Sequence, residues 1–156
     1  MNAAPRTLYL IRRVQLLVYA RLEQALGQFE LTVGQYTLLS LLAQRTGMSA
    51  AQLSRRFAVT PQSMTEMITA LEKKRLIRRR TAPGNRRVLL VSLTATGRAL
   101  TKRCEAVVDQ VEADVLAKLS PAELAAFRRT LATLLEPPSV ETVALERAVA
   151  AGGRRK

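Results

Sequence analysis

The side chains best suited to directional hydrogen bonding form a compact polar group between residues 62 and 73. Amide, hydroxyl and carboxylate groups at this density can pair with the edges of DNA bases in the major groove, and a lysine can contact phosphate. The residues of this group that we expect to contact DNA are Gln62, Ser63, Thr65, Glu66 and Lys73. An ordinary solvated helix face has a similar composition, so the interpretation depends on the elements that carry these residues.

Two short helices are predicted around this polar group. Ser49 and Gln52 have the spacing of a capping box, which starts a helix that ends near Phe57. Thr60 and Pro61 are suited to the N-cap and first position of a second helix. The apolar residues at helical spacing in that second helix are Met64, Met67, Ile68 and Leu71. They predict a buried stripe opposite the polar group.

A basic β-hairpin is predicted after the two helices. Residues 76–80 and 87–93 are rich in strand-forming residues and flank the turn 83–85. Arg86 and Arg87 lie at its tip, where we expect them to contact DNA phosphate or the minor groove. Two helices followed by a hairpin are typical of a winged helix-turn-helix, whose second helix enters the major groove.

Further arginines surround this predicted module. Arg55 and Arg56 lie on its first helix and are candidates for phosphate contact, with Arg55 the one we carry forward. Residues 78–80 are three consecutive arginines that can supply electrostatic attraction to the DNA backbone. Because side chains alternate along a strand, one of the three is expected to point away from the other two.

Long apolar helices are predicted on both sides of the module, over residues 5–29, 94–119 and 120–135. One small winged domain cannot cover so much apolar helix surface, so we expect a homodimer held by these helices. A two-fold dimer places its two reading helices in successive major grooves, roughly 34–36 Å apart, which predicts a palindromic operator.

The predicted fold is therefore mainly α, with a small β-hairpin wing and long N- and C-terminal dimerisation helices. We divide it into a dimerisation helix (1–31), a winged helix-turn-helix DNA-binding domain (32–93), C-terminal dimerisation helices (94–136) and a basic, flexible tail (137–156).

The charge of the chain favours a polyanionic partner. Lys and Arg total 25 against 12 Asp and Glu, for a net charge of +13. Double-stranded DNA is the expected partner, ahead of an acidic membrane surface. No apolar run is long enough for a membrane span or a signal peptide, so we expect a cytoplasmic protein.

Catalytic and metal chemistry are poorly represented in the sequence. The chain has no histidine and a single cysteine, Cys104, and it lacks a glycine-rich phosphate loop. We therefore expect no enzymatic activity, no metal site and no cofactor. Cys104 falls on an apolar helical stripe, where cysteine usually behaves as a small buried hydrophobe rather than a redox switch.

Three segments resemble the multiple-antibiotic-resistance regulator (MarR) family. Residues 31–39 are similar to its LT-x-x-Q-x-x-LL segment, and residues 71–77 to its LEKKGL segment. Residues 85–97 resemble its wing and the start of the next helix. These segments keep the family's order and spacing. The resemblance implies a dimeric transcriptional regulator, expected to be a repressor.

The chain departs from the family pattern at three places. Arg75 stands where the family usually has a helix-ending glycine. Asn85 and Thr81 stand where the wing usually has acidic residues that orient its arginines. Glu66 stands where the family often has arginine; a glutamate can accept from cytosine N4, yet it repels phosphate.

The resemblance also implies a pocket for a small lipophilic or aromatic effector, between the dimer helices and the winged domain. The candidate lining residues are Arg13, Leu17, Tyr36, Leu39 and Met48, although ordinary core packing is the explanation that we favour for them. An effector would act by favouring one spacing of the two reading helices over another.

A second function from a different class stays open at this stage. The net charge and the basic tail would also suit an architectural protein that binds DNA without sequence preference. Specific binding should exceed binding to random DNA by a factor of roughly 10³ or more.

Overall fold

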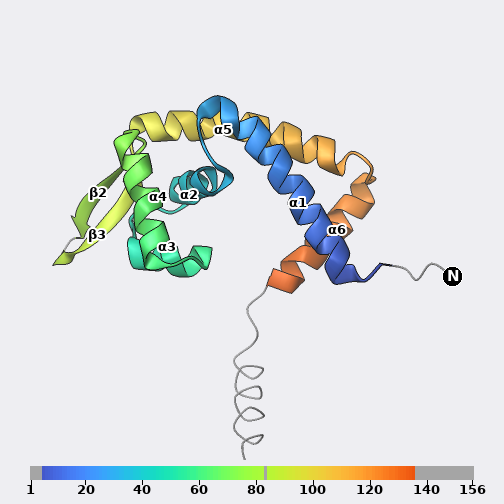
Figure 1. Ribbon diagram of the computed structural model, residues 1–156, viewed down its shortest axis with the longest axis horizontal. Helices are drawn as coiled ribbons and strands as arrows, with labels where there is room; N and C mark the ends of the chain where they lie inside the picture. Colours follow the sequence, from blue (N-terminus) through green and yellow to red (C-terminus); the bar gives the residue numbers. More distant parts are fainter. Residues whose placement is uncertain (1–4, 83, 136–156) are drawn as a thin grey trace, which may run out of the picture. The chain divides into compact units, whose positions relative to one another are not determined.

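The structure, a computed structural model, describes residues 5–82 and 84–135, and for residues 85–87 it describes the backbone alone. Its elements are α1 (Thr7–Leu26), the 3-10 helix η1 (Gly27–Phe29), α2 (Val33–Gln44), β1 (Met48–Ser49), α3 (Ala50–Phe57), α4 (Pro61–Lys73), β2 (Ile77–Ala82), β3 (Asn85–Leu93), α5 (Ala95–Leu116) and α6 (Pro121–Leu135) (Figure 1). By its internal contacts the chain divides into one unit up to Val115 and another from Leu116 onward. The mainly α fold with a small β wing is confirmed.

Two helices start with capping boxes, one of them the Ser49 box that the sequence predicts. Thr32 Oγ1 accepts from the Gln35 backbone N–H at 3.2 Å, and Gln35 Oε1 accepts from the Thr32 N–H at 3.3 Å. Ser49 and Gln52 make the same reciprocal pair at the start of α3. Each capping box satisfies two backbone donors that a helix start leaves without partners.

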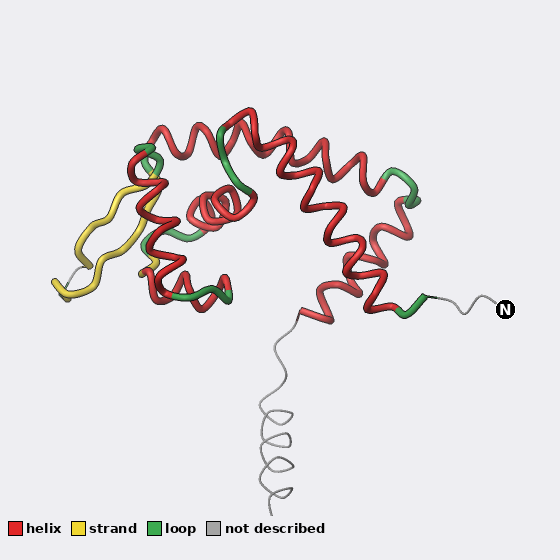
Figure 2. Tube along the Cα trace, viewed as in Figure 1, coloured by secondary structure: helices red, strands yellow, loops and turns green. Residues whose placement is uncertain are grey.

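The sheet of the first unit has three antiparallel strands in the order β1-β3-β2. Figure 2 shows β2 and β3 as one hairpin, paired from Ile77 opposite Leu93 to Thr81 opposite Leu89. Met48 and Ser49 form a short strand on β3. Two residues give no periodic signal, and the strand exists because β3 offers unpaired backbone groups there.

The core of the first unit is built mainly from leucines of several elements. Its buried apolar residues are Leu26, Leu31, Leu38, Leu39, Leu42, Leu53, Met64, Ile68, Leu71, Leu76, Ile77, Val91, Leu93 and Cys104. The stripe predicted on α4 is confirmed, since Met64, Ile68 and Leu71 are buried and Met67 is half-buried. This stripe fixes which face of α4 is left for solvent.

The start of α5 packs tightly on the end of α4 and the start of β2. The Thr94 hydroxyl accepts from the Gly97 N–H at 2.9 Å and donates to the Arg75 carbonyl at 2.8 Å. A Cβ on Gly97 would lie 1.9 Å from the Leu76 carbonyl oxygen. Only glycine allows this approach, so Gly97 sets where α5 leaves the winged module.

Helix α1 leaves most of its apolar surface uncovered within one chain. Leu26 is its buried residue, and Leu8 near its start is 80% exposed. The other large apolar residues exposed on α1 are Tyr9, Leu10, Ile11, Val14, Leu16, Leu17 and Tyr19. The predicted helix over 5–29 is therefore present up to Leu26, with a 3-10 turn to Phe29, but its own unit does not bury it.

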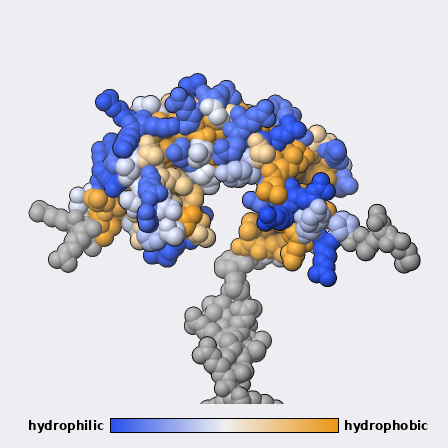
Figure 3. Space-filling view, viewed as in Figure 1, coloured by the Kyte–Doolittle hydropathy of each residue, from blue (hydrophilic) through white to orange (hydrophobic). Residues whose placement is uncertain are grey.

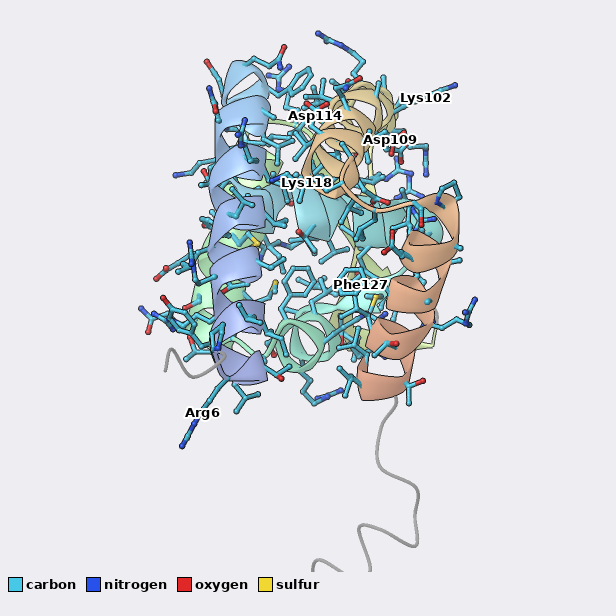
Figure 4. All side chains as sticks on the ribbon, turned by 90° about the vertical axis from the view of Figure 1, so that its right-hand side faces the viewer. Arg6, Lys102, Asp109, Asp114, Lys118 and Phe127 are labelled. Atoms are coloured by element: carbon cyan, nitrogen blue, oxygen red, sulfur yellow. The ribbon has the colours of Figure 1, made fainter. Side chains whose placement is uncertain are left out.

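Helix α6 of the second unit is likewise rich in exposed apolar residues. Ser120 caps the start of this helix, since its hydroxyl and N–H both bond to Glu123 Oε2. Phe127, labelled in Figure 4, is 37% exposed, and Leu135 is 82% exposed. Apolar surface is visible along α6 in Figure 3. Among the helices described, none is long and apolar enough to cross a membrane.

Candidate nucleic-acid interface

Helix α4 presents the predicted polar residues on one surface. The side chains of Gln62, Ser63, Thr65, Glu66 and Lys73 are all exposed. Thr60 caps the helix by accepting from the Ser63 N–H at 3.1 Å, and Pro61 occupies the first turn. The polar side chains therefore lie close to the start of α4. They face solvent because the opposite, apolar face of the helix is buried.

The hydrogen bonds among these side chains are not equivalent. The Ser63 and Thr60 hydroxyls bond to one another at 2.9 Å, and the Thr65 hydroxyl donates to the Pro61 carbonyl at 2.8 Å. Gln62 Nε2 instead donates to Glu66 Oε1 at 3.1 Å, one turn along the helix. The hydroxyls of Ser63 and Thr65 thus bond to groups at the start of the same helix, whereas Gln62 and Glu66 bond to each other.

Helix α3 packs on α4 and carries basic side chains in its last turn. Arg55 and Arg56 are both exposed there. The helix ends at Ala58, which has φ 51°, and the Val59 N–H bonds back to the Ser54 carbonyl at 3.1 Å. This left-handed residue closes α3 so that α4 can start at Pro61, with only Val59 and Thr60 between them.

The hairpin arginines divide as strand alternation predicts. Arg78 and Arg80 are exposed, while Arg79 is half-buried and reaches back to α4. Its Nε lies 3.1 Å from Glu72 Oε2, an ion pair without hydrogen-bond alignment, and its Nη2 donates to Thr69 Oγ1 at 2.9 Å. Arg79 therefore connects the wing to α4. The side chains of Arg86 and Arg87 lie outside the described residues.

The end of α4 is closed by a left-handed arginine. Arg75 has φ 57°, its N–H bonds to the Glu72 carbonyl at 2.8 Å, and the Leu76 N–H bonds to the Leu71 carbonyl at 3.0 Å. This pattern is a Schellman motif, which usually has glycine at the left-handed position. The turn forms although an arginine occupies the left-handed position.

An open pocket of about 430 Å³ lies between α2 and α3. Its lining residues are Tyr36, Thr37, Ser40, Leu41, Gln44, Arg56 and Phe57. Burial is the main cause that raises the pKa of Tyr36 above its usual value. The pocket combines one guanidinium with hydroxyl, amide and aromatic groups, so an anionic aromatic molecule suits it.

The residues that we predicted for an effector pocket are distributed over several places. Tyr36 lines the pocket just described, Leu39 is in the core, and Met48 is half-buried in β1. Arg13 and Leu17 are exposed on α1. Sequence reasoning missed Arg56 and Phe57 as lining residues, because nothing in their local pattern shows that the end of α3 faces α2.

Other chemistry has little support in the described part of the chain. No group of three or more His, Cys, Asp or Glu side chains within residues 5–82 and 84–135 could hold a metal ion. Cys104 is buried, and desolvation raises the pKa of its thiol. A raised pKa lowers the thiolate fraction, so this cysteine is poorly suited to react with oxidants.

Comparison with known proteins agrees with this architecture. A model of the MarR family matches residues 31–89. The HTH-type transcriptional repressor Rv2887 of Mycobacterium tuberculosis is 38% identical over 126 residues, which cover 81% of this chain and 91% of the repressor. Its structure in complex with DNA superposes with a TM-score of 0.74 at 36% identity, covering 86% of this chain and all of that one.

A second structure of the same protein, in complex with p-aminosalicylic acid, gives a TM-score of 0.71 at 36% identity, over 85% of this chain and all of that one. The region that the family model matches, residues 31–89, includes α2, the helices α3 and α4, and most of the wing hairpin. On this similarity, together with the winged fold, the chain belongs to the MarR family of proteins.

Proposed function

We propose that this protein is a homodimeric transcriptional repressor that binds a palindromic DNA operator through α4. The observation that carries the proposal is the exposed polar surface of α4, held outward by its buried stripe and placed beside the basic wing. Support comes from the similar protein that is named a transcriptional repressor and has a structure in complex with DNA.

Each predicted DNA contact has a distinct role in this proposal. Gln62, Ser63, Thr65 and Glu66 face the base edges, because they lie near the start of the reading helix. Lys73 and Arg55 contact phosphates, which give affinity without sequence information. Arg86 and Arg87 contact DNA from the wing. The net charge of +13 adds long-range attraction to all of them.

The exposed apolar surfaces support a dimer. Helix α1 and helix α6 each leave large apolar side chains in solvent within one chain. Contiguous apolar surface of this kind usually marks a protein interface. We propose that a second copy of the chain covers both helices, which would give the two reading helices their two-fold relation. A repressor of this type acts on DNA in the cytoplasm and needs no catalytic activity.

Selection of bound sequences from a random duplex pool at physiological salt tests the proposal. The expected result is an imperfect palindrome with half-sites about one helical turn apart. Affinity for that site should exceed affinity for random DNA by a factor of roughly 10³ or more, so binding should persist in an excess of random DNA. If the pool shows no enriched sequence, the architectural alternative, which uses charge alone, replaces this proposal.

We further propose that a small aromatic acid regulates the protein through the pocket between α2 and α3. Arg56 can pair with a carboxylate, while Tyr36 and Phe57 offer aromatic surface. The similar mycobacterial protein has structures in complex with p-aminosalicylic acid and salicylic acid. Calorimetry with salicylate should give binding that Arg56→Gln removes. Arg55→Gln, a change in the neighbouring arginine outside the pocket lining, should preserve it.

A further inference from the structure

The structure points to a paired reading unit on α4, and we propose that Glu66 orients Gln62 so that this glutamine reads adenine. This inference rests on the proposed function, since it concerns how the operator is selected. It starts from the bond of Gln62 Nε2 to Glu66 Oε1 at 3.1 Å between two exposed side chains one helical turn apart. In this unit Glu66 is a positioning residue, and Gln62 makes the base contact.

The chemistry of the pair allows one orientation of the amide. An ionised carboxylate can only accept hydrogen bonds, so Gln62 must turn its NH₂ group toward Glu66. The opposite orientation would place the Gln62 amide oxygen against a carboxylate oxygen, which is repulsive. The carboxylate of Glu66 therefore fixes the orientation of the Gln62 amide. It thereby determines which hydrogen-bonding groups of Gln62 remain available for DNA.

The groups that remain on Gln62 match one base. One N–H of the amide bonds to Glu66, which leaves the second N–H and the carbonyl oxygen available. In the major groove, adenine presents the N7 acceptor beside the N6 donor, and glutamine can pair with both. Guanine presents an O6 acceptor in place of that donor, and this acceptor would face the amide oxygen of Gln62. The oriented glutamine thus favours adenine over guanine.

The neighbouring side chains strengthen the case for Gln62 and Glu66 as the discriminating pair. The Ser63 and Thr65 hydroxyls already bond to the Thr60 cap and the Pro61 carbonyl. The backbone beneath the pair is held by buried Met64 and Ile68. The pair is therefore presented in a fixed place before DNA arrives, which reduces the ordering that binding requires.

The negative charge of Glu66 has a second consequence. A carboxylate next to DNA repels phosphates and base acceptors, so it weakens binding to random sequence. Removing the charge should therefore raise affinity for random DNA while it lowers discrimination. These two opposite changes separate an orienting role from a purely structural one, in which both affinities would fall together.

The experiment compares variants on the operator obtained by selection with the wild-type protein. Dissociation constants are measured on that duplex and on duplexes in which each adenine of the half-site is replaced by guanine. Wild type should discriminate by about tenfold at one position in each half-site. Gln62→Ala should lose discrimination there. Glu66→Met, which keeps side-chain length without an acceptor oxygen, should reduce it to below about threefold at that same position.

Two further variants complete the test. Glu105→Met removes the same charge from an exposed position on α5 and should leave discrimination unchanged. In the double variant, Glu66→Met should add nothing to the loss caused by Gln62→Ala. The inference is overturned if Glu66→Met retains the adenine preference, or if the two single changes act on different base pairs. Failure of the wild-type protein to enrich any sequence would overturn the proposed function and this inference with it.

Discussion

Replacing Arg75 with glycine should make the protein more stable, although it removes a large side chain. Arg75 is left-handed at φ 57° and closes α4. For a residue with a Cβ, this conformation costs roughly 1–2 kcal/mol, a cost that glycine avoids. The bonds that close the helix are made by the Arg75 N–H, the Leu76 N–H and the Arg75 carbonyl, so glycine keeps all of them.

The expected net gain is smaller than the strain that is relieved. Glycine adds about 0.4–1 kcal/mol of conformational freedom to the unfolded chain. We therefore expect the free energy of unfolding to rise by about 0.8 kcal/mol, the difference between the midpoints of these two ranges. The physical origin is the left-handed backbone alone, because the side chain of Arg75 is exposed.

Urea unfolding followed by circular dichroism measures this change, at a fixed protein concentration because the chain is expected to dimerise. Ala58→Gly, at another left-handed helix end, should shift stability in the same direction. Lys73→Gly, at the right-handed last residue of α4, should instead lower stability, by up to about 1 kcal/mol. An Arg75→Gly protein that is no more stable than wild type, beside a weakened Lys73→Gly protein, would refute the reasoning.

Three more predictions follow from individual contacts. Gly97→Ala should destabilise the fold by about 2 kcal/mol or more in the same urea assay, because the added Cβ would lie 1.9 Å from the Leu76 carbonyl oxygen. Unchanged stability would exclude that close approach. Arg79→Met should weaken operator binding without changing the slope of log affinity against log salt, since Arg79 bonds to α4; a slope smaller by about one would show a phosphate contact instead. Hydrogen bonds from the Ser120 hydroxyl and backbone N–H lower the pKa of Glu123, so α6 should lose this stabilising contribution as the pH falls through the lowered pKa. An NMR titration of Glu123 in a Ser120→Ala protein should show the pKa moving back up, and an unmoved value would contradict the cap.

Local features of this protein were predictable because they depend on residues close together in the chain. A capping box needs only a hydroxyl and a glutamine three residues apart, and Ser49 starts α3 as predicted. The buried stripe of α4 follows from helical periodicity, and the hairpin from two strand-forming runs around a turn. The family resemblance ordered these pieces into a winged helix-turn-helix.

Other features depend on distances between residues far apart in the sequence. Strand alternation predicts that one of the arginines 78–80 points to the opposite face from the other two. Only the packing of β2 beside α4 brings Arg79 into contact with Thr69 and Glu72. Strand β1 exists because β3 has a free edge beside Met48.

The candidate sites divide in the same way. The sequence by itself determined which polar residues lie on the outer face of α4, because the apolar stripe fixes the helix rotation. Only the tertiary structure decided that Arg56 reaches a pocket on α2, since this depends on how two helices pack. It also decided that the hydroxyls near Gln62 bond to the helix start while Gln62 bonds to Glu66, because side-chain rotamers select among several possible partners.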